Sequence, residues 1–291
     1  MQPGDDTMLL PTGFLPLDMV TGGGLGLGEA TLVIAPPGLG KTILACQLGS
    51  TMAISGTRVL HISTEETNRQ LEPRIVACHC NVPISLIKDG VKEKLMQRDQ
   101  LERYQNLRRE LSPERFRIVN WDDRSKDIEG GYEALMEAAA KAMGGMPQVV
   151  LLDWLGGALG RNASNDPAVF RMILKRGANA QAAAAKRYGI HTITFAQADL
   201  KQSIGKIRVD ATVLSECKTL DEPMTNVWGI TGILHPQAEV DSHTQSAVFR
   251  EQQYIYVSKA RHRADVQIPV HRDFLFQRFL PGKICGSNSF L

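Results

Sequence analysis

A glycine-rich segment has the residue types of a phosphate-binding loop. Residues 35–42 read Ala-Pro-Pro-Gly-Leu-Gly-Lys-Thr, which fits the pattern GxxxxGK[S/T] except that alanine replaces the first glycine. Glycines let backbone N–H groups curl around an anion at a helix N-terminus, the lysine adds a positive charge, and the threonine can bind Mg²⁺. The sequence therefore predicts a site for ATP and Mg²⁺ whose nucleotide contacts are Ala35, Pro36, Pro37, Gly38, Leu39, Gly40, Lys41, Thr42 and Ile43.

Further polar residues follow apolar runs elsewhere in the chain. Asp153 ends the run at residues 149–152, and we expect it to bind Mg²⁺ together with Thr42. Glu65 and Glu66 follow a second run, and one of them could polarise the attacking water. Gln197 could hydrogen-bond the γ-phosphate or that water. Each of these residues could instead have no catalytic role: Asp153 could be a helix cap or strand end, the glutamates solvated acids, and Gln197 a polar strand end.

The apolar runs predict the strands that bring these residues together. Strands are expected at residues 30–35, 58–63, 117–120, 148–152 and 191–196, with helices at 43–54, 92–111, 131–143 and from 166 to near 189. This alternation predicts an α/β, doubly wound, mainly parallel sheet with helices on both faces. Residues 227–233 and 254–259 are predicted to be late, antiparallel strands. Since parallel strands present their carboxyl ends at one edge, the polar residues should meet there.

Length and composition favour one large domain. The chain has 291 residues and 43% hydrophobic content, enough to bury one α/β core. We expect tails at residues 1–12 and 281–291 around a domain at 13–280. The formal net charge of +2 is too small to indicate an overall positive surface that would attract nucleic acid or a membrane, so any basic surface must be local. No segment predicts a membrane span, and we expect no membrane partner.

Cysteine usage indicates a reducing compartment. The five cysteines are irregularly spaced and do not form a disulfide framework. With an expected ATP site, this predicts a cytoplasmic protein. Cys78, His79 and Cys80 have no second pair of ligands at the spacing of a zinc finger, so buried side chains are favoured over a metal site.

Several motifs resemble those of the RecA/DnaB superfamily. They are the segments at residues 12–14, 17–18, 21–24 and 28–29, the phosphate-binding loop, and Ser-Thr-Glu-Glu at residues 63–66. The loop's pattern, Ala-x-Pro-x-x-Gly-Lys-Thr, is similar to that of DnaB-type helicases. The resemblance implies a RecA-like fold, with Glu65 on the position of the family's catalytic glutamate. It also implies a ring-forming, hexameric helicase that acts in replication on single-stranded DNA, with other replication proteins as further partners.

A late motif distinguishes members of this superfamily. Lys259-Ala260-Arg261 follows a predicted strand and resembles the finger that DnaB and phage replicative helicases insert into a neighbouring subunit's site. Such a finger neutralises charge in the transition state. The same residues could instead form only the exposed side of a strand, where alternate residues share one face.

Two loops at strand ends are candidates for contact with DNA. They contain Arg161 in the first, and Lys201, Lys206 and Arg208 in the second. A few basic residues per subunit, repeated around a ring, can bind a phosphate backbone with little sequence preference. Three alternatives remain open: a KaiC-like signalling ATPase, a recombinase-type ATPase, and an accessory or loader subunit.

Overall fold

The computed structural model describes residues 8–87, 93–121, 128–158, 167–198, 209–210, 214, 219–234, 239–240, 247–248, 251–260 and 265–282. A nine-stranded sheet in the order β13-β12-β11-β8-β3-β7-β6-β4-β5 forms its centre. The strands from β8 to β5 run parallel, whereas β11, β12 and β13 are antiparallel to their neighbours. The bounds are β3 Ala30–Ala35, β4 Val59–Ser63, β5 Phe116–Asn120, β6 Val149–Asp153, β7 His191–Gln197, β8 Asn226–Leu234, β11 Glu251–Lys259, β12 Val266–Asp273 and β13 Arg278–Pro281.

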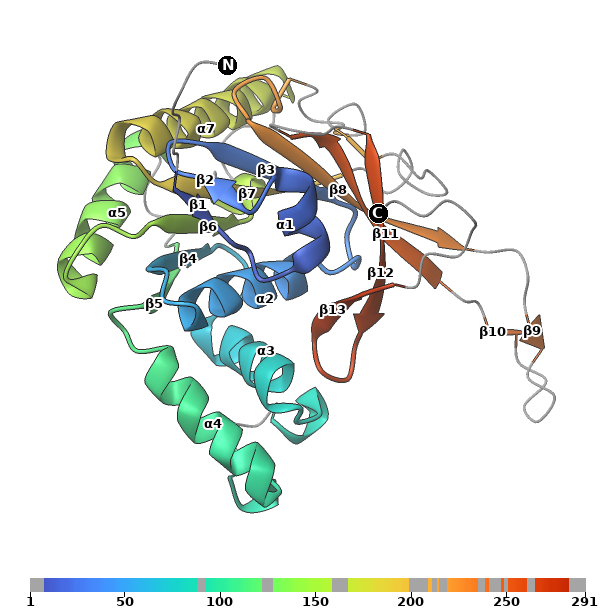
Figure 1. Ribbon diagram of the computed structural model, residues 1–291. Helices are drawn as coiled ribbons and strands as arrows, with labels where there is room; N and C mark the ends of the chain where they lie inside the picture. Colours follow the sequence, from blue (N-terminus) through green and yellow to red (C-terminus); the bar gives the residue numbers. More distant parts are fainter. Residues whose placement is uncertain are drawn as a thin grey trace, which may run out of the picture.

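Helices cover both faces of this sheet (Figure 1). Alternate residues of β3 belong to different cores: Val33 packs with one group of helices and Leu32 with the other. This explains why β3 reads as an unbroken apolar run. The first group is α1 (Leu15–Thr21), α2 (Lys41–Ile54), α3 (Asn68–Cys80) and α4 (Arg98–Glu110), and the second is α5 (Ile128–Met143) and α7 (Pro167–Tyr188).

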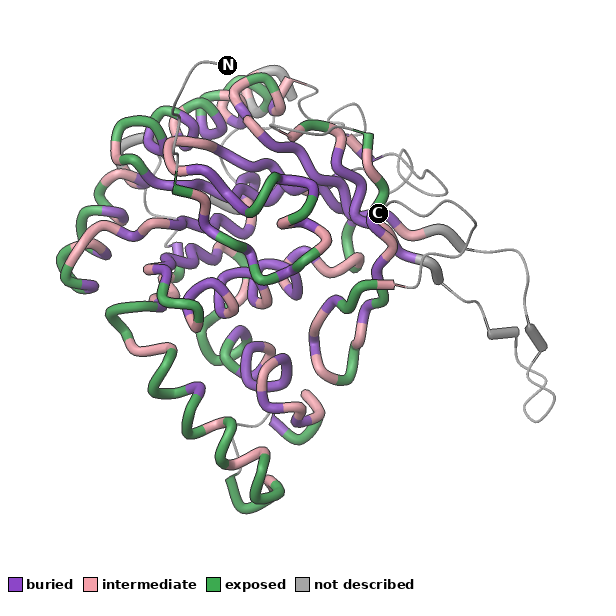
Figure 2. The backbone as a smooth tube through the Cα atoms, in the orientation of Figure 1, coloured by how far each residue is buried: buried purple, intermediate pink, exposed green. Residues whose placement is uncertain are grey.

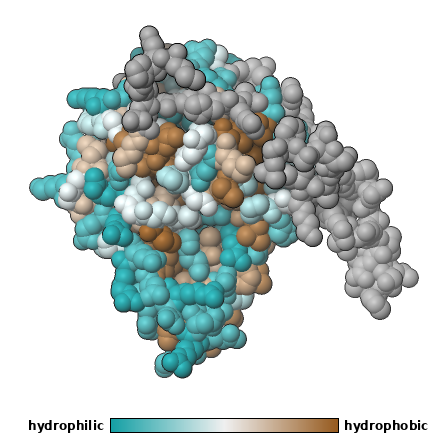
Figure 3. Space-filling model, in the orientation of Figure 1, coloured by the Kyte–Doolittle hydropathy of each residue, from teal (hydrophilic) through white to brown (hydrophobic). Residues whose placement is uncertain are grey.

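The outer helix α4 is the most exposed of the first group. Leu107 is its one buried residue, and the tube of α4 is mainly green in Figure 2. The corresponding lower part of the surface is mostly hydrophilic in Figure 3. The short elements are η1 (Ile84–Leu86), η2 (Glu93–Leu95), α6 (Leu155–Ala158), and the pair β9 (Glu239–Val240) and β10 (Ala247–Val248).

The predicted fold class is confirmed, whereas two elements were not predicted and one predicted strand arrangement is only partly right. The sequence reading missed α3, which contains Pro73 inside the helix, where proline normally breaks the backbone pattern. It also missed the hairpin of β12 and β13. The late strands β8 and β11 pair antiparallel with each other, as predicted, but β8 also pairs parallel with β3.

The packed part of the chain begins and ends beyond the predicted domain limits. Strand β1 (Leu9–Leu10) pairs with β2 (Leu25–Gly26), and Leu10 is buried. Thr12 is fully buried and donates a hydrogen bond of 2.6 Å to Asp18. At the other end, β13 reaches Pro281. Residues 9–12 and 281 therefore belong to the fold and not to tails. Among the described helices, none is long and apolar enough to cross a membrane.

Candidate nucleotide-binding site

The glycine-rich segment forms a tight turn between β3 and α2. Gly38 and Gly40 have φ angles of 78° and 100°, in the left-handed region where side chains with a Cβ are strained. A Cβ built on Gly38 would meet nothing within 4 Å, whereas one on Gly40 would lie 2.8 Å from the Phe279 ring. Helix α2 begins at the next residue, Lys41. The turn thus presents an open backbone surface at a helix N-terminus, which is the geometry that binds phosphate.

The β12–β13 hairpin holds this turn from the side (Figure 1). The guanidinium of Arg272 in β12 donates a hydrogen bond to the carbonyl oxygen of Gly38. Gln47 of α2 donates to the carbonyl of Phe279 at 2.9 Å and accepts from its backbone N–H at 2.7 Å. The hairpin therefore supports both the turn and the helix that follows it.

Asp153 lies at the carboxyl end of β6, beside Ser63 of β4. The residue is 4% exposed, and burial raises the pKa of its carboxyl to about 6. A hydrogen bond with Thr42 and the charge of Lys41 oppose that increase, while Glu65 and Glu66 add to it. Its Oδ1 atom has no hydrogen-bond partner among the described residues. A buried carboxylate oxygen without a partner, beside a threonine hydroxyl, fits a site for Mg²⁺, which prefers oxygen ligands.

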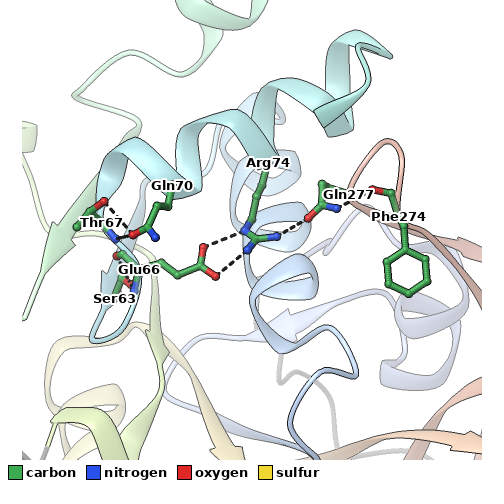
Figure 4. Close-up of polar contacts among 7 residues, drawn as sticks. All are labelled: Ser63, Glu66, Thr67, Gln70, Arg74, Phe274 and Gln277. Atoms are coloured by element: carbon green, nitrogen blue, oxygen red, sulfur yellow. Dashed lines mark hydrogen bonds and ion pairs between the residues drawn. The ribbon is translucent and has the colours of Figure 1, made fainter. Parts of the chain in front are cut away.

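The two glutamates after β4 have different surroundings, and Figure 4 shows those of Glu66. Glu66 is paired with Arg74 of α3 through two hydrogen bonds, of 2.9 and 2.7 Å. Glu65 is exposed, and its Oε1 accepts a hydrogen bond of 2.6 Å from the indole N–H of Trp154. Glu66 is thus neutralised by a cation, whereas Glu65 keeps a carboxylate oriented by a neutral donor.

Gln197 lies next to the start of the phosphate-binding turn. It is the last residue of β7 and stands opposite Ala35 in the parallel pairing of β3 with β7. The backbone N–H of Ala198 donates to the carbonyl of Ala35 at 3.0 Å. The fold therefore brings Lys41, Thr42, Asp153, Glu65 and Gln197 to the same edge of the sheet, as the order of strands predicts.

The remaining predicted residues lie at or beyond the limits of what the structure describes. Lys259 ends β11, is exposed, and donates to the carbonyl of Asp221 at 3.3 Å. The other predicted residues lie outside the described ranges: Arg161, Lys201, Lys206, Arg208 and Arg261. Cys78, His79 and Cys80 are at the end of α3, and the described residues contain no group of three or more His, Cys, Asp or Glu side chains able to hold a metal.

Sequence comparison finds short similarities to DNA repair proteins. The DNA repair protein RadA of Mycolicibacterium smegmatis is 41% identical over 70 residues, which are 24% of this chain and 15% of RadA. The chain thus matches less than a fifth of the length of this relative.

Two solved structures share the fold over 95% of this chain. One is a DnaB-like replicative helicase whose structure includes its interactions with primase, with a TM-score of 0.75, 15% identity and 62% of that chain covered. The other is a KaiC-like protein from Pyrococcus horikoshii OT3, with a TM-score of 0.62, 15% identity and 100% of that chain covered. At these identities the likeness establishes the RecA-type fold alone.

A family model matches about two thirds of the chain. The AAA_25 model, which describes an AAA domain, matches residues 7–199. That range contains the phosphate-binding turn, both glutamates, Asp153 and Gln197. The chain therefore belongs to this family of AAA domains and is a P-loop ATPase with a RecA-type fold.

Proposed function

We propose that this chain hydrolyses ATP with Glu65 as the general base. The observation that carries the proposal is the division of roles between the two glutamates: Arg74 pairs with Glu66, while Glu65 is exposed and oriented by Trp154. A base must be free to accept a proton from water, and an ion-paired carboxylate is a poorer acceptor. Glu65 is therefore favoured over Glu66.

The reaction requires few groups, each with a defined task. A water oxygen attacks the γ-phosphorus, the bond from that phosphorus to the ADP oxygen breaks, and the water proton passes to the Glu65 carboxylate. Lys41 and the N-terminus of α2 hold the phosphates, and Gln197 binds the γ-phosphate or the attacking water. Thr42 and Asp153 would hold Mg²⁺, which, when bound, neutralises charge on the phosphate oxygens.

The proposal extends to a ring-forming helicase that moves along single-stranded DNA. Its support is the fold shared with a DnaB-like replicative helicase and the Lys259-Ala260-Arg261 motif, whose first residue ends β11. In this proposal Arg261 enters the site of the next subunit of a hexamer, in the cytoplasm and alongside other replication proteins. The KaiC-like match and the short RadA similarity support the signalling and recombination alternatives, and these differ from the helicase in their response to DNA.

Single-stranded DNA is expected to stimulate ATP turnover through the second loop. Replacing Lys201, Lys206 and Arg208 together with glutamine should weaken DNA binding across all sequences and lower the slope of log K against log salt by about 2, because each backbone contact releases less than one counterion. Fluorescence anisotropy with two oligonucleotides of different sequence measures both effects. An unchanged slope would exclude the loop from DNA contact, and turnover indifferent to DNA would favour the KaiC-like alternative.

A further inference from the structure

One arginine joins three segments beside the candidate active site (Figure 4). The guanidinium of Arg74 in α3 contacts both carboxylate oxygens of Glu66 and donates to the side-chain oxygen of Gln277, in the turn between β12 and β13. The side chains of Arg74 and Glu66 are 27% and 23% exposed. This planar, two-pronged geometry fixes direction as well as distance, and lysine cannot reproduce it.

The helix that carries Arg74 and the hairpin turn that Arg74 contacts are each stabilised by other hydrogen bonds. Helix α3 starts with a capping box in which Thr67 and Gln70 satisfy each other's backbone N–H groups. The turn of the hairpin is held separately, because Arg278 donates to Asn81 at 2.7 Å and the N–H of Ile84 donates to the carbonyl of Leu275 at 2.9 Å. Helix α3 and the hairpin turn are therefore held by contacts that do not involve Arg74.

The turn that carries both glutamates is held at its backbone and at one side chain. The Ser63 hydroxyl donates to the Glu66 carbonyl at 2.7 Å, and Asn120 donates to the same carbonyl at 2.8 Å. Arg74 adds the contact at the Glu66 side chain. Glu65 lies between Ser63 and Glu66 in the chain, so the orientation of its carboxylate depends on how firmly this turn is held.

We propose that Arg74 is a positioning residue for ATP hydrolysis, which by pairing with Glu66 fixes the turn that presents Glu65 to the attacking water. This inference rests on the proposed role of Glu65. The same hairpin contacts Arg74 through Gln277 and the phosphate-binding turn through Arg272. Arg74 thereby links the turn that carries Glu65 to the same hairpin that contacts the phosphate-binding turn.

Arg74→Met is expected to lower kcat by about 10- to 100-fold, because an error of about 1 Å in the position of a reacting group has an effect of this size. The affinity for a fluorescent ATP analogue should change by less than about threefold, since Lys41 and its turn are intact. Arg74→Lys should give an intermediate kcat. Glu65→Gln provides the reference for full loss of the base. Arg103→Met, which breaks an exposed pair with Asp99 on α4, is the matched control and should retain wild-type turnover.

A double variant separates this role from general damage. If Arg74 acts through Glu66, Arg74→Met combined with Glu66→Gln should be no slower than Arg74→Met alone. The proposal would be overturned if the losses in kcat of the two single variants multiplied in the double variant. It would also be overturned if Arg74→Met had an unchanged kcat. So would equal losses in kcat and analogue affinity.

Hydrogen exchange tests the positioning role without using turnover. Arg74→Met should speed exchange of the backbone amides at residues 63–67 several-fold, while Arg103→Met leaves them unchanged. Unchanged exchange in Arg74→Met would overturn the positioning role even in an active enzyme. Wild-type protein that turns over ATP no faster than Lys41→Ala would instead refute the proposed function, and the exchange result would still decide what Arg74 holds.

Discussion

Lys41→Ala and Asp153→Ala are each expected to reduce ATP turnover by about 10²- to 10³-fold or more, because each removes a charge that stabilises the transferred phosphoryl group directly or through Mg²⁺. Steady-state release of phosphate measures the loss. Neither change removes packing from the apolar cores, so the circular dichroism spectrum should be unchanged. Asp153→Ala should unfold at the same or a higher temperature in the absence of nucleotide, since burial disfavours the charged carboxylate and leaves one of its oxygens without a partner.

Lys94→Ala is the matched control for the lysine variant. Lys94 is an exposed residue of η2 and is not part of the phosphate-binding turn, so its loss should leave turnover at the wild-type level. Hydrolysis retained in purified Lys41→Ala protein would remove this turn from the site of catalysis.

Arg261→Ala is expected to be nearly inactive alone and to recover activity when mixed with Lys41→Ala. A finger supplied by a neighbouring subunit contributes on the order of 10³–10⁵ in rate in other systems. In a mixed ring, the intact Lys41 site of one subunit meets the intact Arg261 of the next, so a fraction of the interfaces regain turnover. Titrating one variant against the other at constant total protein measures the recovery, with co-assembly checked by native mass spectrometry.

Two outcomes of the mixing experiment would contradict a finger that acts in trans. Absence of recovery at every ratio, in assemblies that contain both variants, would place Arg261 in its own subunit's site. Full activity of Arg261→Ala alone would mean that this residue has no role in catalysis and is only an exposed residue of a strand. Both outcomes would favour the KaiC-like or accessory alternatives.

Much of the fold could be predicted because the strands of a parallel sheet that is covered on both faces are continuous apolar runs in the sequence. Every residue of β3 and of the first four positions of β6 is apolar or small enough to be buried on one side or the other. Strands β6 and β7 end in polar residues that could take part in catalysis, Asp153 and Gln197. Helix α3 could not be predicted in the same way, since its polar start and Pro73 hide its buried side.

The residue pattern alone could not separate Glu65 from Glu66 as the base, and only the resemblance to the RecA/DnaB superfamily favoured Glu65. What distinguishes them in the structure is Arg74, eight residues beyond Glu66 and two turns into a helix that the pattern did not reveal. The support of the phosphate-binding turn was also hidden, because Arg272 and Phe279 meet Gly38 and Gln47 across more than 230 residues of chain. Such contacts depend on the position of the hairpin, which only the whole fold determines.

The most direct test of the proposed helicase is strand separation by the purified chain. A forked DNA duplex with a fluorophore and quencher at its end should open in the presence of ATP and Mg²⁺, and remain closed with Lys41→Ala or with a nonhydrolysable analogue. The number of ATP molecules consumed should rise with the length of the duplex, since a translocating ring advances with repeated turnover. ATP hydrolysis that single-stranded DNA stimulates, but that opens no fork at any duplex length, would contradict the helicase and favour a recombinase-type ATPase.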